Sequence, residues 1–183
     1  MSENLETAVF ASGCFWCSEA IFNEVKGVVE VKSGYSGGHI ENPSYDDVCT
    51  GTTGHAESVR IKFDSDEISY DDLLEIFFYT HDPTTLNRQG NDVGPQYRSA
   101  VFYIDDQQKE KALKKIQELN NSGEFKKQIV TQVEKFTNFY PAESYHERYF
   151  ERNSSQPYCM FVISPKIKKL RKKFGESLAT ESK

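Results

Sequence analysis

Apolar and polar residues alternate along this 183-residue chain with two periods, one typical of strands and the other of helices. Short runs bounded by turn residues predict strands at 7–13, 28–34, 57–63, 99–104 and about 129–136. Apolar positions three or four residues apart predict helices at 17–27, 70–80, 105–121, 143–151 and 165–174. Because strands and helices interleave, we expect an α+β fold, an α/β two-layer sandwich with a central mixed β-sheet flanked by helices.

Two long irregular stretches, 36–55 and 81–99, show neither period. Long irregular segments in a compact domain usually carry function, and the many glycine, asparagine and aspartate residues here suit turns. The stretches also contain Tyr45, His55, Asp92, Gln96 and Tyr97. We expect these side chains to surround a functional site.

The chain length and the lack of a linker predict a single catalytic domain over residues 1–174. Residues 175–183, GESLATESK, are expected to form a disordered tail. The sequence shows no secretory signal and no apolar run long enough to cross a membrane. We therefore expect a soluble, cytoplasmic protein without a membrane partner.

The net charge of −6, from 22 basic and 28 acidic residues, disfavours nucleic acid and anionic membranes as partners. The basic segment KIKKLRKKF at 166–174 is a local exception. Ile167, Leu170 and Phe174 have helical spacing, which predicts a basic amphipathic helix. We expect its apolar stripe to pack against the domain and its basic face to be solvated, and a site for a polyanion is the alternative.

The four cysteines indicate thiol chemistry or a metal site, because reducing compartments rarely keep structural disulfides. Cys14 follows a predicted strand and Gly13, and it precedes a helix whose first N–H groups and dipole would stabilise a thiolate. Cys17 lies one helical turn further on, so the two thiols can form a disulfide after oxidation. Between them, Phe15 and Trp16 suggest an apolar wall that holds a methyl group. Ordinary core packing of these side chains is the alternative.

Five segments of the chain together resemble one enzyme family. GCFWC at 13–17 is similar to the Gly-Cys-Phe-Trp-Gly signature of the A-type peptide-methionine sulfoxide reductases. Four further blocks follow in the family's order: GYSGG at 34–38, NPSYDDVCTGTTGHAE at 42–57, HDPTTLNRQGNDVGPQYRS at 81–99 and AESYHERYF at 142–150. The resemblance extends from the first strand to about residue 150, and it implies a ferredoxin-like core.

The resemblance implies an oxidoreductase that repairs oxidative damage by reducing the S epimer of methionine sulfoxide, free or in proteins. By this similarity Cys14 is the attacking nucleophile and becomes a sulfenic acid. Glu57, at the end of GHAE, matches the proton donor, because the sulfoxide oxygen must be protonated or strongly hydrogen-bonded for attack. An apolar setting would favour the neutral carboxyl group that this role requires.

The resemblance also implies roles for five neighbours of this pair. Tyr45 and Tyr97 match the tyrosines that hydrogen-bond the sulfoxide oxygen. Asp92 matches the aspartate that orients the substrate backbone or a water molecule. Phe15 and Trp16 match the pocket for the terminal methyl group. His55 belongs to the same motif and is expected to support the site from behind.

Recycling of the nucleophile is the step where this sequence departs from the family. Cys17 replaces the usual glycine of the signature, and the C-terminal segment lacks the glycine-rich cysteine tail of many relatives. Cys159 and Cys17 are both candidates for the resolving thiols, although two cysteines three apart on a helix must deform it to form a disulfide. Cys49 is expected to be a structural thiol. The family implies thioredoxin as reductant, a monomer, and no metal or organic cofactor.

Three other functions remain open at this point. A general disulfide oxidoreductase also begins with a strand, a Cys-x-x-Cys motif and a helix, but it would leave the other motifs without a role. A metal-binding module is disfavoured, because the four histidines at 39, 55, 81 and 146 are scattered. The last is a protein that binds oxidised methionine without chemistry, and turnover would distinguish it.

Overall fold

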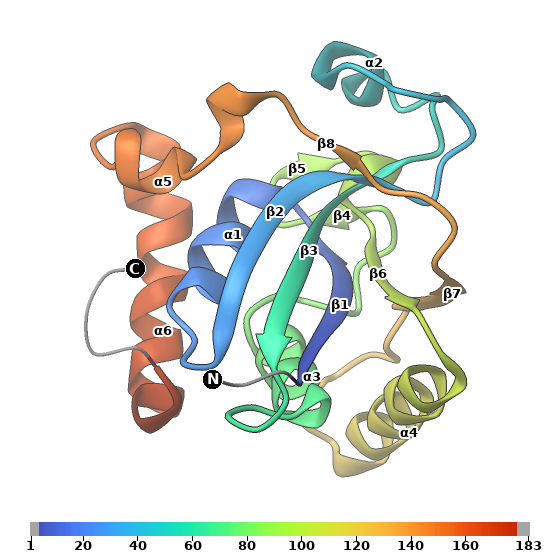
Figure 1. Cartoon of the computed structure of the whole chain (residues 1–183), viewed down its shortest axis with the longest axis vertical. Coiled ribbons are helices and arrows are strands. Elements are labelled where there is room, and N and C mark those ends of the chain that lie inside the picture. Colours follow the sequence, from blue (N-terminus) through green and yellow to red (C-terminus); the bar gives the residue numbers. More distant parts are fainter. Residues whose placement is uncertain (1–3, 179–183) are drawn as a thin grey trace.

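The computed structural model of the protein describes residues 4–178. Its centre is a six-stranded sheet (Figure 1) made of β1 (Leu5–Ser12), β2 (Val28–Ser36), β3 (Ala56–Asp64), β6 (Ser99–Tyr103), β7 (Gln132–Lys135) and β8 (Tyr140–Pro141). The strand order is β7-β6-β1-β3-β2-β8. Neighbouring strands are antiparallel except β6 and β7, which run parallel, so the sheet is mixed as predicted.

Four of these strands and two helices form a ferredoxin-like core. Along the chain, β1 is followed by α1 (Phe15–Asn23), β2, β3, α3 (Tyr70–Tyr79) and β6. In space the four strands lie in the order β6-β1-β3-β2. This βαββαβ arrangement is the ferredoxin-like motif, and the predicted α+β fold with a central mixed sheet flanked by helices is confirmed.

The two faces of the sheet are covered differently. Phe10 on β1 points toward the helices, and its ring lies 5.8 Å from Phe22 of α1 and 4.8 Å from Phe77 of α3. The next residue back, Val9, points to the opposite face, as the alternation of a strand requires. There it belongs to a smaller cluster covered by Phe136 and Phe139. The main core therefore lies between the sheet and the helices.

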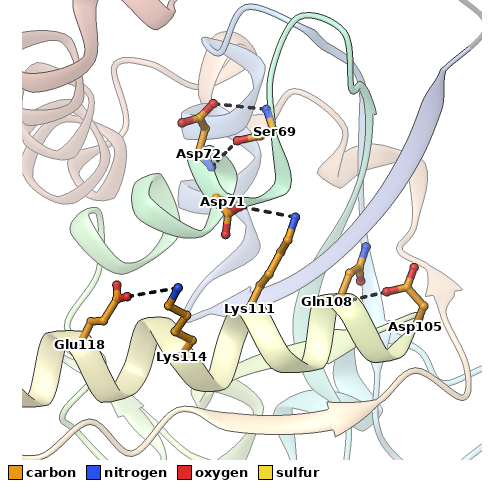
Figure 2. A network of polar contacts seen from close by, with 8 residues as sticks. All are labelled: Ser69, Asp71, Asp72, Asp105, Gln108, Lys111, Lys114 and Glu118. Atoms are coloured by element: carbon orange, nitrogen blue, oxygen red, sulfur yellow. Dashed lines mark hydrogen bonds and ion pairs between the residues drawn. The ribbon is translucent and has the colours of Figure 1, made fainter.

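Helix α4 (Asp106–Ser122) packs beside α3, and Figure 2 shows the polar contacts at this junction. The side chains of Ser69 and Asp105 cap the first turns of α3 and α4, respectively. Lys111 of α4 lies 3.4 Å from Asp71 of α3. Because both partners of this ion pair are largely exposed, the caps define the helix ends and the ion pair adds little to stability.

The two stretches predicted to be irregular contain only short elements. The 36–55 stretch contains α2. The 81–99 stretch contains a hairpin of two short strands, each two residues long, and a 3-10 turn. The elements are α2 (Tyr45–Cys49), β4 (Arg88–Gln89), β5 (Asp92–Val93) and η1 (Pro95–Tyr97). Turn residues in these stretches therefore predicted loops correctly, whereas the single turn of α2 was too short to show a period.

The predicted helix over 143–151 is wrong. The chain instead forms a 3-10 turn, η2 (Ser144–His146), and a short helix, α5 (Tyr149–Arg152). Between them Arg148 has a φ of 50°, in the left-handed region. Its backbone N–H donates to the buried carboxyl group of Glu19. This tertiary hydrogen bond replaces a helical one, so the local helical pattern does not decide the structure here.

The C-terminal part packs on the outer side of α1. The π-helix η3 (Cys159–Ile163) leads into α6 (Ser164–Phe174), which contacts α1 (Figure 1). The predicted tail begins with a 3-10 turn, η4 (Gly175–Ser177), and Leu178 is 8% exposed and pairs with Val25. The prediction for 179–183 lies outside the described residues. In the part of the chain that is described, no helix is long and apolar enough to span a membrane.

Replacing Phe10 by alanine is expected to lower the free energy of unfolding by roughly 3–5 kcal/mol, because the change leaves a cavity among fully buried rings. Urea unfolding followed by circular dichroism measures this loss. Val29→Ala is the matched control, since the Val29 side chain is 58% exposed and its truncation removes little buried surface. Equal losses in the two variants would contradict the packing described.

Candidate active site

Cys14 lies between β1 and α1, at the junction that the sequence predicts. It is the N-cap residue of α1, with extended backbone angles, and its side chain is buried. Gly13 has a φ of +96°, and a Cβ added there would lie 2.8 Å from the side chain of Gln89. Glycine at this position therefore permits both the turn into the helix and the close approach of the 81–99 stretch.

Cys14 and Cys17 form a pair of hydrogen-bonded thiols. Cys17 is the third residue of α1, and side chains at the N-cap and third positions face each other in the first turn. From the sequence we expected that a Cys14–Cys17 disulfide would deform a helix. That expectation is wrong, because Cys14 lies outside the helical backbone. Burial raises the pKa of Cys14 well above its usual range, and the hydrogen bond lowers the pKa of Cys17 to about 7. In this arrangement Cys17 is the more acidic thiol of the pair, so it can take up the proton that Cys14 releases when it attacks.

Glu57 on β3 is a buried carboxyl group next to this pair, with 1% of its surface exposed. Its Oε1 accepts a 3.1 Å hydrogen bond from the backbone N–H of Phe15. Its Oε2 is buried and has no partner among residues 4–178. Burial raises the pKa of Glu57 to about 8, although the Phe15 hydrogen bond opposes this shift. The group therefore holds a proton at neutral pH, with an oxygen free to donate it.

Tyr45 and Tyr97, both half-buried, lie within electrostatic reach of the same carboxyl group. Burial raises the pKa of each hydroxyl group, and the charge of Glu57 is the next largest cause for both. The Tyr45 ring lies 6.3 Å from that of Phe15, and Tyr97 packs against the apolar cluster that contains Cys14. Both hydroxyl groups therefore remain hydrogen-bond donors near Glu57 over the physiological pH range.

Phe15 and Trp16 occupy different depths beside the nucleophile. Phe15 is fully buried and belongs to the main core. Trp16 is half-buried and stacks on Tyr149, with ring centroids 3.7 Å apart and an interplanar angle of 7°. The indole N–H of Trp16 donates to Nδ1 of His146 at 3.0 Å. Phe15 therefore has the core position that was the alternative, whereas Trp16 keeps a partly exposed apolar ring beside Cys14, against which the 143–149 segment packs.

His146 is a residue of this site that the sequence interpretation missed. Its ring lies 5.0 Å from Phe15 and 4.6 Å from Tyr45. Burial lowers its pKa, and because Nδ1 accepts from Trp16, the proton of the neutral ring lies on Nε2. Nε2 is buried and unpartnered within the described residues. Only the AESYHERYF block indicated this segment, since no local pattern reveals a contact across 130 residues.

Two carboxyl groups hold the 143–149 segment in place over α1. Glu143 accepts hydrogen bonds of 2.9 Å from the hydroxyl group of Tyr35 and from the backbone N–H of Tyr45. Glu19, which is buried, accepts from Ser33 and from the backbone N–H of Arg148. Because the segment is fixed at both ends, its aromatic rings keep their positions against Trp16.

Asp92 reaches the thiol pair through Tyr158, another residue that sequence interpretation missed. The Tyr158 hydroxyl group donates to Asp92 at 2.7 Å and lies 3.6 Å from the Cys17 sulfur. The Tyr158 ring also meets Trp16 edge to face. The structure therefore brings Asp92 to the site, with Tyr158 between it and the sulfur atom.

The other two cysteines have different environments. Cys159 is fully buried in the same apolar cluster as Cys14 and Cys17, and the charge of Cys17 contributes to raising its pKa. Cys49, expected to be a structural thiol, is exposed and forms a hydrogen bond with Tyr45, so it is not part of the buried core. Within residues 4–178, no three His, Cys, Asp or Glu side chains are grouped as a metal site would require.

His55 supports the neighbouring loop, as its expected place behind the site suggests. Its Nδ1 accepts from the backbone N–H of Gly38 at 3.0 Å, and its Nε2 lies 2.7 Å from the carbonyl oxygen of Ile40. The buried imidazole ring thus connects the start of β3 to the irregular stretch that leads to Tyr45.

The profile of the family described as "Peptide methionine sulfoxide reductase" matches residues 6–178. The chain belongs to this family. A relative named peptide methionine sulfoxide reductase MsrA, from Nautilia profundicola, is 56% identical over 173 residues, which cover 94% of this chain and 98% of the relative. The predicted family and enzyme class are therefore confirmed.

Solved structures agree with membership in the peptide methionine sulfoxide reductase family. Mxr1 from Saccharomyces cerevisiae in reduced form has a TM-score of 0.78 and 32% identity, over 85% of this chain and 90% of Mxr1. Mxr1 in complex with Trx2 has a TM-score of 0.54 and 24% identity, over 80% of this chain and 85% of that chain. The first structure supports the fold and the family, and the second supports the fold.

The stability of this peptide methionine sulfoxide reductase is expected to fall as the pH rises from about 5 to 8. The Glu57 carboxyl group has an ordinary pKa of 4.5 when unfolded and a pKa of about 8 when folded. Between these values the unfolded chain loses the proton first, so unfolding becomes easier by up to about 1.4 kcal/mol per pH unit. Urea unfolding of the wild type and of Glu57→Gln at both pH limits measures this change.

The Glu57→Gln variant should show a much smaller pH dependence. What remains is the sum of Glu19, whose pKa burial raises to about 7, and His81, whose pKa burial lowers to about 3. Their contributions oppose each other below the ordinary histidine pKa of 6.5. A wild-type slope that persists unchanged in Glu57→Gln would show that Glu57 does not hold its proton in the folded protein.

Proposed function

We propose that this protein reduces the S epimer of methionine sulfoxide to methionine, acting on free methionine sulfoxide and on oxidised proteins, and so repairs oxidative damage. The observation that carries the proposal is the buried, protonated carboxyl group of Glu57 beside the Cys14 sulfur. A sulfoxide sulfur reacts with a thiol when its oxygen is protonated or strongly hydrogen-bonded. The hydrogen bond from the N–H of Phe15 to Glu57 of β3 holds the carboxyl group beside the first turn of α1, where Cys14 lies, and supports these two roles.

The proposed reaction transfers one oxygen atom from substrate to Cys14. The Cys14 sulfur attacks the sulfoxide sulfur, and its thiol proton passes along the hydrogen bond to the Cys17 thiolate. Glu57 donates its proton to the sulfoxide oxygen, which Tyr45 and Tyr97 hold by hydrogen bonds. The S–S bond made by this attack then breaks together with the S–O bond of the substrate. The protonated oxygen passes to the Cys14 sulfur, which becomes a sulfenic acid, and methionine leaves with the two electrons that Cys14 gives up.

Selection of one epimer follows from the handedness of the site. A sulfoxide sulfur carries an oxygen, a methyl group and the rest of the side chain. In the proposed complex the oxygen lies toward Glu57, and the methyl group lies against Phe15 and Trp16. Because the direction of attack by Cys14 is also fixed, the rest of the methionine side chain can leave the sulfur in one direction only. On that side Asp92 orients the substrate backbone or a bound water molecule.

Recycling is proposed to begin with Cys17. Its thiol condenses with the Cys14 sulfenic acid, which gives a Cys14–Cys17 disulfide and water. Cys159 then attacks Cys17, which releases Cys14 and forms a Cys17–Cys159 disulfide. The facing positions of Cys14 and Cys17 and the burial of Cys159 in their cluster support this order. Thioredoxin is the proposed reductant, and the solved complex of the relative Mxr1 with Trx2 supports this choice. No metal or organic cofactor takes part in this scheme.

The proposed enzyme acts as a single catalytic domain and a monomer in the cytoplasm. The side chains assigned above lie between β1 and η3. The four cysteines are free thiols, which suits a reducing compartment.

Turnover of the two separated epimers in peptide form, with dithiothreitol as reductant, tests the reaction. The S epimer should be converted and the R epimer should not, and Cys14→Ser should have no activity.

Glu57→Gln should lower kcat/KM by about 10²–10⁴-fold, because the proton donor is lost. In the wild type, kcat/KM should fall as the pH rises through about 8, where Glu57 loses its proton. Conversion of neither epimer by the folded wild type would refute the proposed function.

Mass mapping of disulfides after a single turnover without reductant tests the order of recycling. The wild type should accumulate Cys17–Cys159, and Cys159→Ser should stop at Cys14–Cys17. Cys49→Ser, which removes a thiol that the scheme does not use, should behave as the wild type does. A Cys14–Cys159 disulfide formed at the wild-type rate in Cys17→Ser would contradict this order.

A further inference from the structure

The basic segment found in the sequence forms α6 and has no role in the chemistry above. Six of the 22 basic residues lie within this 11-residue helix, which contains no acidic residue. Arg171 pairs at 2.8 Å with Glu24, the C-cap residue of α1. Lys168 and Lys172 are exposed and form no ion pair with any residue from 4 to 178. Figure 1 shows α6 at the outer side of the molecule, away from α4. A strongly positive surface therefore lies on a protein with a net charge of −6.

An exposed apolar pair lies directly before this helix. Phe161 of η3 is 76% exposed and is the most exposed large hydrophobic side chain within residues 4–178, and Met160 is 51% exposed. Their neighbours in η3, Cys159 and Ile163, are fully buried in the cluster of the active-site thiols. The same turn of π-helix therefore has one side on the recycling thiol and the other side in solvent.

A basic groove extends the positive surface on the far side of α6. It has a volume of about 560 Å³ and lies between α6, the loop after α3 and the segment after α4. Lys166 lines this groove, and its charge contributes to lowering the pKa of Cys17. Two acidic side chains lie among the lining residues, which include Asp82, Glu124, Lys126, Lys127, Lys166 and Lys169. The positive surface thus lies within electrostatic reach of the thiols.

We propose that Met160, Phe161 and the basic residues Lys168 and Lys172 form the surface on which the protein reductant docks. The partner is a dithiol protein of the thioredoxin type, with apolar residues next to its thiols and acidic residues around them. An apolar centre with a charged rim is the usual composition of a protein interface, and opposite charges accelerate the encounter. This inference rests on the proposed recycling through Cys17 and Cys159.

Reduction of the enzyme at this surface proceeds by two thiol–disulfide exchanges that conserve atoms and electrons. One thiolate of the reductant attacks the Cys159 sulfur of the Cys17–Cys159 disulfide, which forms a mixed disulfide and releases Cys17 as a thiolate. The second thiol of the reductant then attacks its own partner sulfur and releases Cys159. The reductant ends as a disulfide, and its two protons and two electrons reside on Cys17 and Cys159. A partner docked over Phe161 lies two residues along the chain from Cys159, whose buried sulfur must become exposed before it is attacked.

Two other occupants of the surface are less consistent with the structure. A polyanion would use the lysines but would gain nothing from the exposed ring of Phe161. A second copy of this chain would bring another strongly basic helix against the first, which like charges oppose. Only a partner with both apolar and acidic groups matches all the observations.

Steady-state kinetics with two reductants test the proposal. We expect Lys168→Glu/Lys172→Glu and, separately, Phe161→Ser to raise KM for thioredoxin by roughly tenfold or more. Turnover supported by dithiothreitol should stay within about twofold of the wild type, because a small dithiol needs no docking surface. Added salt should raise the wild-type KM for thioredoxin and should have little effect on the charge-reversed variant.

The control variant is Lys109→Glu/Lys114→Glu, which reverses the charge of two exposed lysines of α4 and changes the net charge by the same amount. Its KM for thioredoxin should match that of the wild type. An unchanged KM in both test variants, or an equal rise in the control, would overturn the proposal. Loss of binding to heparin without a change in KM would assign the surface to polyanions instead. Failure of the proposed function is distinguishable, because then the wild type would show no turnover even with dithiothreitol.

Discussion

The hydrogen bond from the backbone N–H of Phe15 to Glu57 connects the first turn of α1 to β3. The first N–H groups of a helix have no partner within the helix, and here one of them is satisfied by a carboxyl group from the central sheet. The same contact fixes the distance between Glu57 and the start of α1, where Cys14 lies. Helix, sheet and nucleophile are therefore positioned by one interaction, and the aromatic rings pack around it.

Several polar groups of the site are buried at a cost to stability. Glu57 and Glu19 have raised pKa values because of burial, and Nε2 of His146 lacks a partner within residues 4–178. Burying such groups without full compensation is unfavourable, so the surrounding core must offset it. The fully buried rings of the main core, such as Phe10 and Phe77, supply that apolar surface next to the site. Unmet hydrogen-bonding capacity of this kind is what a substrate with a strongly polar oxygen can use.

Local sequence patterns predicted the ferredoxin-like order well, because each of its strands and helices has a clear period. They failed at 143–151, where Glu19 binds the backbone of Arg148 and so prevents a continuous helix. Motif resemblance brought together Cys14, Glu57 and the two tyrosines, whereas His146 and Tyr158 approach from distant segments that local patterns do not connect. The proton distribution between Cys14 and Cys17 was also beyond the sequence, because it depends on their mutual hydrogen bond and on the contacts that Lys166 and Tyr158 make with Cys17 from distant segments.

The stacking of Trp16 on Tyr149 has an optical consequence. Trp16 is the only tryptophan of the chain. In the sequence it lies between Cys14 and Cys17, which exchange protons and electrons in the proposed cycle. Its intrinsic fluorescence therefore comes from a single place, the first turn of α1, without background from other indoles. Thiolates and disulfides quench nearby indole emission, so this enzyme carries an internal reporter of its own redox state. Stopped-flow fluorescence on the unlabelled protein can follow substrate binding, oxidation and re-reduction as separate phases.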